Sequence, residues 1–191
     1  PGDFILGLYE IGSERGMNMV NSTREEAATY AADGYAREKG LGAVAVTYGV
    51  GMVATMAALG GANNEMVPVV VIGGAPGMGE RDGRRIHHSV SDDLDAPRLM
   101  ADHLTSHSML LDNADTAYAQ IDWILDHCMH ELRPVFIELP RDLISAVPNQ
   151  IYSPPDTVAR STSIPERTNA CADDLVATIR AARRPIINVG N

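Results

Sequence analysis

Cysteine and long apolar runs are scarce in this chain of 191 residues. The two cysteines, Cys128 and Cys171, form neither a CxxC pair nor the dense pattern of a disulfide scaffold, which is typical of a protein kept in a reducing compartment. The longest apolar stretch, Met66–Ala75, contains a proline and two glycines and is much shorter than the roughly 20 residues that cross a bilayer. We therefore expect a cytoplasmic protein without a membrane segment.

Basic residues are the second shortage. The 15 lysines and arginines are outnumbered by 25 acidic residues, which gives a formal net charge of −10. Nucleic-acid backbones are bound by clustered Lys and Arg, so nucleic acid is not an expected partner. The HExxH, GxSxG and GxxxxGK[ST] motifs are also absent, which removes the commonest metalloprotease, hydrolase and P-loop interpretations. Because the chain starts at Pro1 and its apolar pattern begins at once, we expect it to be a piece of a longer protein.

Short apolar runs alternate with longer segments of helical periodicity. The runs that predict buried strands are 43–46, 68–72, 134–137 and 185–189. The segments that predict helices are 25–37, 114–132 and 172–182. Strands that are apolar at consecutive positions need cover on both faces. We therefore predict an α/β fold whose parallel sheet, of five or six strands, is flanked by helices and has 43–46 and 69–72 at its centre.

A change of composition marks a predicted domain boundary. Between 148 and 168 the periodicity is lost and prolines collect, which is typical of an irregular connector. The division that we predict is a first domain over 1–148, a linker over 149–168 and the truncated start of a second α/β domain over 169–191.

A glycine-rich turn follows the predicted strand 43–46. The segment Gly49-Val50-Gly51-Met52-Val53-Ala54 matches the GxGxxA part of a dinucleotide fingerprint. The next strand leads into 73–76 with no acidic residue to hold a ribose hydroxyl, so the fingerprint is incomplete. The alternative is that these glycines only allow a tight turn from strand to helix.

Two adjacent glutamates begin the predicted helix 25–37. Ser22-x-x-Glu25 and Thr23-x-x-Glu26 both match a capping box, so these carboxylates are candidates for satisfying free backbone donors. The other interpretation is a desolvated carboxylate that shares a proton with a ligand nitrogen.

Histidines supply the remaining candidates. His87 and His88 lie in a polar loop and are adjacent, so one can line a pocket while the other supports it. His103 and His107 at helical i, i+4 spacing, and the pair 127 and 130, are possible metal ligands. Neither pair has a third ligand at fixed spacing, so we assign no metal-binding residue.

Four motifs, taken in order, resemble the amino-terminal pyrimidine-binding domain of thiamine diphosphate enzymes. They are Pro1-Gly2-Asp3-Phe4, then Glu25 five positions before Tyr30-Ala31-Ala32-Asp33-Gly34-Tyr35-Ala36-Arg37, then Thr47-Tyr48-Gly49-Val50-Gly51, and His87-His88. The resemblance is greatest to the pyruvate and indolepyruvate decarboxylase branch and extends to about Pro148. The run from Ala32 to Arg37 is shared across the superfamily, whereas Gly-Asp-Phe with paired histidines is specific to 2-oxo acid decarboxylases.

The resemblance implies a role for each matching residue. Glu25 matches the catalytic glutamate, which hydrogen-bonds a ring nitrogen of the aminopyrimidine and favours the tautomer that removes the thiazolium proton. Asp3, His87 and His88 match groups that transfer protons on the substrate side and assist product release. The positions that match contacts of the cofactor are Pro1, Glu25, Thr47 and Val50.

The same resemblance implies the cofactors and the division of labour between domains. The family binds the cofactor's diphosphate and magnesium with a Gly-Asp-Gly and a distant asparagine, and this chain has no Gly-Asp-Gly. Magnesium is therefore expected to be bound mainly by a domain outside this chain. The segment 1–148 is then an N-terminally truncated pyrimidine-binding domain, and 169–191 begins the family's middle domain.

The implied function is non-oxidative decarboxylation of a 2-oxo acid of the pyruvate, indolepyruvate or phenylpyruvate type to an aldehyde. The expected assembly is a homodimer or homotetramer formed through this domain. The reason is that the helix from Gly51, with Met52, Val53, Met56 and Leu59, has more apolar positions than one buried face needs. Two alternatives stay open: a carboligase of the acetolactate synthase type, which shares the glutamate, and a stand-alone binding domain without catalysis.

Overall fold

The computed structural model describes residues 2–82, 86–154 and 165–186. The chain divides into two compact units, Pro1–Tyr152 and Ser153–Asn191. The second unit contains helix α7, Pro165–Ala181, which begins seven residues before the predicted start at 172. The predicted strand 185–189 lies mostly outside the described residues, and its first two residues, which are described, are not in a strand. None of the described helices combines the length and the apolarity needed to cross a membrane.

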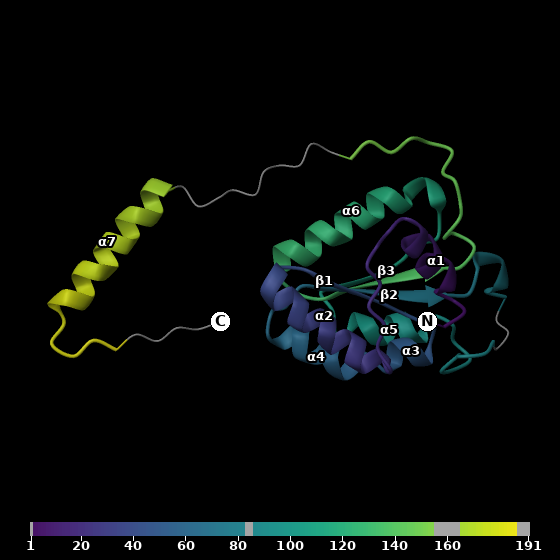
Figure 1. The fold of residues 1–191 in the computed structure, drawn as a ribbon, viewed down its shortest axis with the longest axis horizontal. Helices are drawn as coiled ribbons and strands as arrows, with labels where there is room; N and C mark the ends of the chain where they lie inside the picture. Colours follow the sequence, from purple (N-terminus) through teal and green to yellow (C-terminus); the bar gives the residue numbers. More distant parts are fainter. Residues whose placement is uncertain (1, 83–85, 155–164, 187–191) are drawn as a thin grey trace. The chain divides into compact units, whose positions relative to one another are not determined.

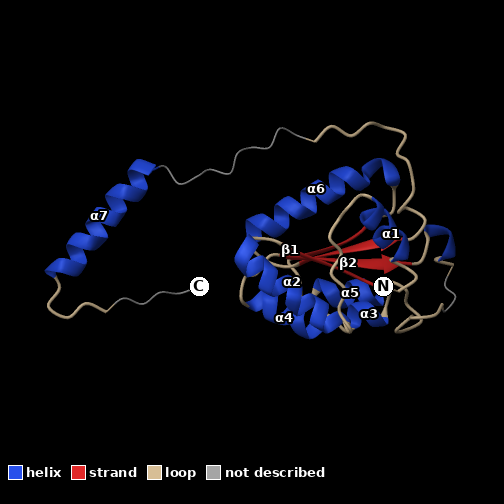
Figure 2. Ribbon diagram, viewed as in Figure 1, coloured by secondary structure: helices blue, strands red, loops and turns tan. Residues whose placement is uncertain are grey.

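A parallel sheet forms the centre of the first unit (Figures 1 and 2). Its strands are β1 Gly42–Val46, β2 Val69–Ala75, β3 His107–Leu110 and β4 Val135–Pro140. Their order is β1-β2-β4-β3, and every neighbouring pair is parallel. The predicted class, an α/β fold with a parallel sheet flanked by helices, is confirmed.

Helices cover both faces of this sheet (Figure 1). Their bounds are α1 Leu6–Glu14, α2 Glu25–Lys39, α3 Val50–Val53, α4 Met56–Asn64, α5 Ala96–Asp102 and α6 Ala114–Glu131, with a 3-10 turn, η1, at Met78–Glu80. On one face, residues of α2, α4 and α5 pack with Val44, Val69 and Val71. On the other, Ile124 and Cys128 of α6 pack with the opposite side of β2 and β4. The period of three and four residues in the sequence therefore locates the helix faces that are buried.

The position of β1 differs from the prediction. It lies at an edge of the sheet, whereas β2 has a neighbour on each side. Val44 and Val46 are buried, but Ala43 and Ala45 are exposed, because α6 packs over β2, β3 and β4. Small alanines need little cover, so an unbroken apolar run does not require burial on both faces here. The described residues form four strands, fewer than the five or six predicted.

The close packing of α2 on β1 generates a stability prediction. A Cβ at Gly42 would overlap the carbonyl group of Ala32, whose carbon would lie 2.8 Å away. Gly42→Ala must push α2 from the sheet, so we expect it to lower the free energy of unfolding by about 1–3 kcal/mol. Urea unfolding of this chain, followed by circular dichroism, measures the effect.

Gly61→Ala is the matched control for this prediction. Gly61 lies in α4, and a Cβ there meets nothing within 4 Å. The added methyl group should raise helix stability by roughly 0.5–1 kcal/mol. Equal stabilities of the two variants would contradict the close contact between α2 and β1.

Candidate functional site

The chain's amino-terminal segment lies over the carboxyl end of the sheet, where parallel α/β folds bind their ligands. Phe4 is buried together with Tyr48, which follows β1, and Ala75, the last residue of β2. A Cβ at Gly74 would lie 2.5 Å from the backbone oxygen of Phe4, so a glycine is needed for this close approach. The sheet therefore fixes the position of the neighbouring residue Asp3.

Asp3, His87 and His88 meet at this end of the sheet. Nε2 of His87 lies 2.5 Å from Oδ2 of Asp3, and Nε2 of His88 lies 3.6 Å from Oδ1 of Asp3. Desolvation raises the pKa of Asp3. The hydrogen bond and charge of His87, together with the charge of His88, outweigh desolvation and hold the pKa of Asp3 below its usual range. The three side chains thus form a cluster of interacting titratable groups that remains open to solvent.

Phe4 is the platform on which the two histidines rest. Its ring centroid lies 4.9 Å from that of His87 and 6.1 Å from that of His88. The Tyr48 ring is 5.4 Å away, and the guanidinium of Arg141 lies 5.2 Å from the Phe4 centroid. These contacts limit the orientations available to both imidazoles.

The backbone of His88 is held against the glycine-rich turn. His88 has a positive φ of 68°, which is uncommon for a residue with a side chain. Its carbonyl oxygen accepts a hydrogen bond of 3.1 Å from the amide of Val50, and any Cβ at Gly49 would overlap that oxygen. Gly49 itself has φ 59° and is the N-cap of α3. Of the two interpretations of this motif, the structure therefore shows a tight turn that also receives the histidine loop.

Glu25 is the first residue of α2, and the capping-box prediction for it is wrong. The N-cap is Arg24, with no side-chain capping bond, so the two glutamates occupy the first and second helical positions rather than the third. The Glu25 side chain is partly buried and, within the described residues, makes no hydrogen bond or ion pair. Its carboxylate is available for another partner.

Thr47 and Gly51 lie beside this carboxylate. A Cβ at Gly51 would be 3.6 Å from Oε1 of Glu25 and 2.7 Å from Cγ2 of Thr47. Oγ1 of Thr47 is buried and has no hydrogen-bond partner among the described residues. Gly51 therefore lies between the Thr47 methyl group, which a side chain at this position would overlap, and the Glu25 carboxylate. Pro1, also predicted to contact the cofactor, lies outside the described residues.

Of the two other histidine pairs, one is separated by the fold, whereas His127 and His130 both lie in α6. Helix α5 ends at Asp102 and His107 lies in β3, so His103 and His107 do not share a helix. The ring of His107 lies 5.9 Å from that of His127, and His130 faces Glu131. In the described part of the chain, Asp3, His87 and His88 are the only three side chains with the spacing of metal ligands.

A buried carboxylate that we did not single out from the sequence lies close by. Glu138 of β4 is 1% exposed, and its Oε1 is 3.3 Å from the Arg81 guanidinium. Its Oε2 is 3.5 Å from Nε of Arg98. Desolvation raises the pKa of Glu138 to about 7, although both arginines oppose the rise. The available signal was a single charged residue directly after the predicted strand 134–137, followed by the apolar Leu139.

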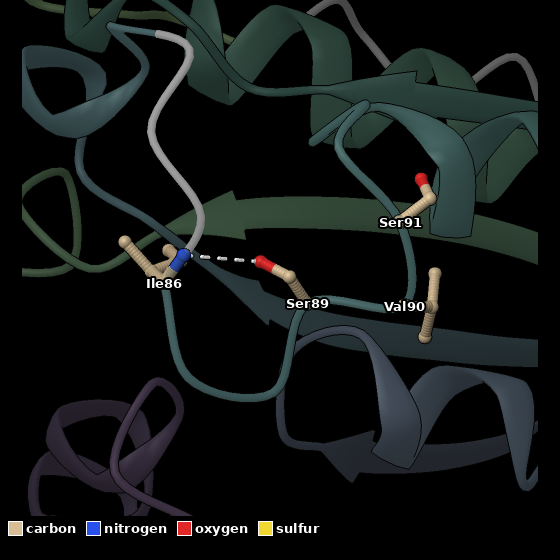
Figure 3. A pocket seen from close by; sticks show the side chains of 4 residues that line it. All are labelled: Ile86, Ser89, Val90 and Ser91. Atoms are coloured by element: carbon tan, nitrogen blue, oxygen red, sulfur yellow. Dashed lines mark hydrogen bonds between the residues drawn. The ribbon is translucent and has the colours of Figure 1, made fainter.

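A small cavity lies in the loop beyond the histidines (Figure 3). It is lined by Ile86, Ser89, Val90 and Ser91. The hydroxyl of Ser89 accepts a 3.4 Å hydrogen bond from the amide of Ile86, which folds the loop back on itself around His87 and His88. The histidines thus sit at the tip of a compact turn.

The family described as thiamine pyrophosphate enzyme, N-terminal TPP binding domain, matches residues 1–99. This chain belongs to that family. It is 34% identical to a pyruvate decarboxylase of Aspergillus parasiticus over 99% of this chain and 33% of that protein. It is 34% identical to pyruvate decarboxylase 3 of Oryza sativa subsp. japonica, over 100% of this chain and 33% of the relative.

An indole-3-pyruvate decarboxylase of Azospirillum brasilense is 32% identical over 99% of this chain and 34% of its own length. The chain thus spans about a third of the length of the curated relatives that it matches. The resemblance inferred from the four sequence motifs is confirmed at the level of the family.

The buried Glu138 generates a prediction for pH-dependent stability. Its pKa is about 7 in the folded protein against an ordinary value of 4.5. The folded state therefore binds a proton at the Glu138 carboxyl more tightly than the unfolded state does. The stability that this protonation contributes is lost as the pH rises from about 4.5 to about 7. Glu138→Gln removes the titration. We expect the stability of the variant relative to wild type to increase by about 2–3 kcal/mol between pH 5 and 8.

Urea unfolding of this chain at several pH values tests this expectation. Glu131→Gln removes an exposed carboxylate at the end of α6 and controls for the change in net charge. Parallel pH curves for wild type and Glu138→Gln would contradict the raised pKa.

Proposed function

We propose that this chain supplies the pyrimidine-activating half of a thiamine diphosphate-dependent 2-oxo acid decarboxylase. The observation that carries the proposal is the convergence of two groups at one end of the sheet. Glu25 and Thr47 lie beside Gly51 as one group, and Asp3 and the paired histidines form a second. The hydrogen bond from the Val50 amide to the His88 carbonyl connects the two groups. The relatives named pyruvate and indole-3-pyruvate decarboxylases support the same reaction.

The residues present fit the aminopyrimidine of the cofactor. Glu25 offers a carboxylate to a ring nitrogen, and the buried Thr47 hydroxyl has no hydrogen-bond partner in the part of the chain that the structure describes. Gly51 lets the backbone of the turn lie close to the Glu25 carboxylate and against the methyl group of Thr47. Val50 exposes 48% of its surface and would supply an apolar contact for the ring.

The protein's own contribution is to place protons. Bound thiamine diphosphate supplies the nucleophile and the electron acceptor that decarboxylation requires. Glu25 would hold a proton at the pyrimidine ring nitrogen. Asp3, His87 and His88 would transfer protons at the substrate carbon and assist release of the aldehyde. A carboxylate hydrogen-bonded to an imidazole suits that task because the two groups can share the proton.

The rest of the cofactor and the substrate would be bound with the help of parts of the protein outside this site. Magnesium and the diphosphate would be bound by a segment with the Gly-Asp-Gly that this chain lacks. The first 148 residues would be the pyrimidine-binding domain, 149–168 a linker and 169–191 the start of the middle domain. The substrate would be a pyruvate-, indolepyruvate- or phenylpyruvate-type acid.

We propose self-association as well, through the face around Glu25 and Val50. The apolar segment after Gly51 forms two short helices, α3 and α4, rather than one. Met52 and Leu59 are buried in the unit's own core. Fewer apolar side chains are therefore left over for an interface between copies than the sequence suggested. The exposed side chain of Val50 is the main one that remains.

Glu25→Gln tests the cofactor-activating role. In the complete protein the amide cannot share the proton, so exchange of the thiazolium proton of bound thiamine diphosphate should slow by about 100-fold or more. Proton NMR after transfer to deuterium oxide measures this rate. The neighbouring Glu26→Gln is the control and should exchange like wild type. Wild-type exchange in Glu25→Gln would contradict the proposal.

Asp3→Asn tests the substrate-side role separately. We expect kcat for aldehyde formation to fall by about 100-fold or more, because the asparagine cannot exchange a proton with His87. Thiazolium proton exchange should stay unchanged, since it depends on Glu25. Asp126→Asn on the exposed face of α6 is the matched control.

Assays of Asp3→Asn with pyruvate, indolepyruvate and phenylpyruvate, analysing all products, also separate the proposed reaction from the carboligase alternative. An unchanged kcat in Asp3→Asn would contradict the proton-transfer role. Formation of an acetohydroxy acid instead of an aldehyde by the wild-type protein would favour the carboligase.

A further inference from the structure

The histidine loop is closed at its base by an ion pair. A guanidinium nitrogen of Arg81 lies 2.5 Å from Oδ1 of Asp95, and Arg98 lies 3.6 Å from the same oxygen. Arg81 precedes His87 by six residues, and Asp95 follows His88 by seven. The pair therefore joins a residue that precedes the histidines to one that follows them. We call this pair the loop neck.

Glu138 connects the loop neck to the sheet. It accepts a hydrogen bond of 3.3 Å from Arg81 and lies 3.5 Å from Arg98. Its own backbone is fixed in β4, between β2 and β3, where it pairs with Gly73 and Leu110. One carboxylate, held by the most central part of the fold, thus binds arginines from both ends of the loop.

Other contacts extend this connection to the site. The hydroxyl of Tyr48 donates a 2.9 Å hydrogen bond to the carbonyl of Leu94, the residue before Asp95. Tyr48 in turn contacts Phe4, on which the histidines rest. Glu80, next to Arg81, accepts a 2.8 Å hydrogen bond from Arg141, whose guanidinium lies over the Phe4 ring. Both ends of the loop are therefore tied to the platform below the histidines.

Stability does not account for a charge cluster in this position. Glu138 is almost fully buried, and neither its Oε2 nor Nε of Arg98 has a hydrogen-bond partner among the described residues. Removing ionised groups from water costs several kcal/mol per ion, and apolar replacements are often neutral or stabilising. Such clusters are retained in some proteins because they specify one arrangement.

We propose that Glu138 is a positioning residue, which, through Arg81, Asp95 and Arg98, holds the loop neck and so sets His87 and His88 against Asp3. Glu138 touches neither histidine and acts only through the arginines. The positioning is a property of this chain's own residues. Its expected effect on catalysis rests on the proposed decarboxylase function.

Hydrogen exchange measured by mass spectrometry on the complete protein tests the positioning directly. Glu138→Gln keeps the size of the side chain and removes its charge. We expect peptides within 86–94 to exchange about 10-fold faster, with α6 and β2 unchanged. Glu131→Gln, which removes an exposed carboxylate, should leave the loop as it is in wild type.

Asp95→Asn is the second variant, because its side chain is 43% exposed and its substitution leaves the buried carboxylate in place. It weakens the ion pair between Asp95 and Arg81 and should accelerate hydrogen exchange in the same peptides. It also keeps the test decisive if Glu138→Gln fails to fold. Unchanged exchange within 86–94 in Asp95→Asn, or faster exchange throughout the protein in Glu138→Gln, would overturn the proposal.

Kinetics of the same variants provide the functional readout. We expect kcat for aldehyde formation to fall about 10-fold in both, with little change in KM, and thiazolium proton exchange to remain at the wild-type rate. A lower kcat with unchanged thiazolium proton exchange would indicate displaced histidines rather than a damaged cofactor site. A protein without decarboxylase activity would refute the proposed function, yet the exchange result would still decide the positioning role.

Discussion

The hydrogen bond from the amide of Val50 to the carbonyl oxygen of His88 is the constraint on which the candidate site depends. It joins a turn that follows β1 to a loop nearly forty positions further along the chain. The bond requires Gly49, since a side chain there would occupy the position of the carbonyl oxygen. Through it, the carboxylate of Glu25 and the imidazole pair become parts of one surface.

The sheet supplies the rigidity that this arrangement needs. Parallel strands end at a common edge, and the segments that follow β1, β2 and β4 contribute Tyr48, Glu80 and Arg141 to the surroundings of Phe4. Phe4 is 1% exposed, so it anchors the amino-terminal segment firmly beside the site. The solvent-accessible side chains of Asp3 and His87 thus pack next to a buried aromatic ring, which helps an exposed loop to keep a defined geometry.

The polar groups at this end of the sheet are of two kinds, those left unpaired and those paired with one another. Within the described residues, Thr47 Oγ1 is buried without a hydrogen-bond partner and the Glu25 carboxylate forms no ion pair. Such unpaired groups are costly in a protein core and useful where a ligand completes their hydrogen bonds. Glu138 and its arginines instead satisfy much of their charge among themselves. The first arrangement fits ligand binding, and the second fits the support of a loop, even though both lie at the same end of the sheet.

Sequence periodicity by itself determined the α/β class, the parallel sheet and the main helices, because burial imposes a local repeat that can be read from apolar spacing. The motifs around Asp3, Glu25 and the paired histidines identified the family. Tertiary structure alone decided that β1 lies at an edge, that His107 belongs to a strand and that Glu25 starts its helix rather than capping it. It also decided the association of Glu138 with Arg81 and Arg98, since contacts between residues distant in sequence leave no local pattern.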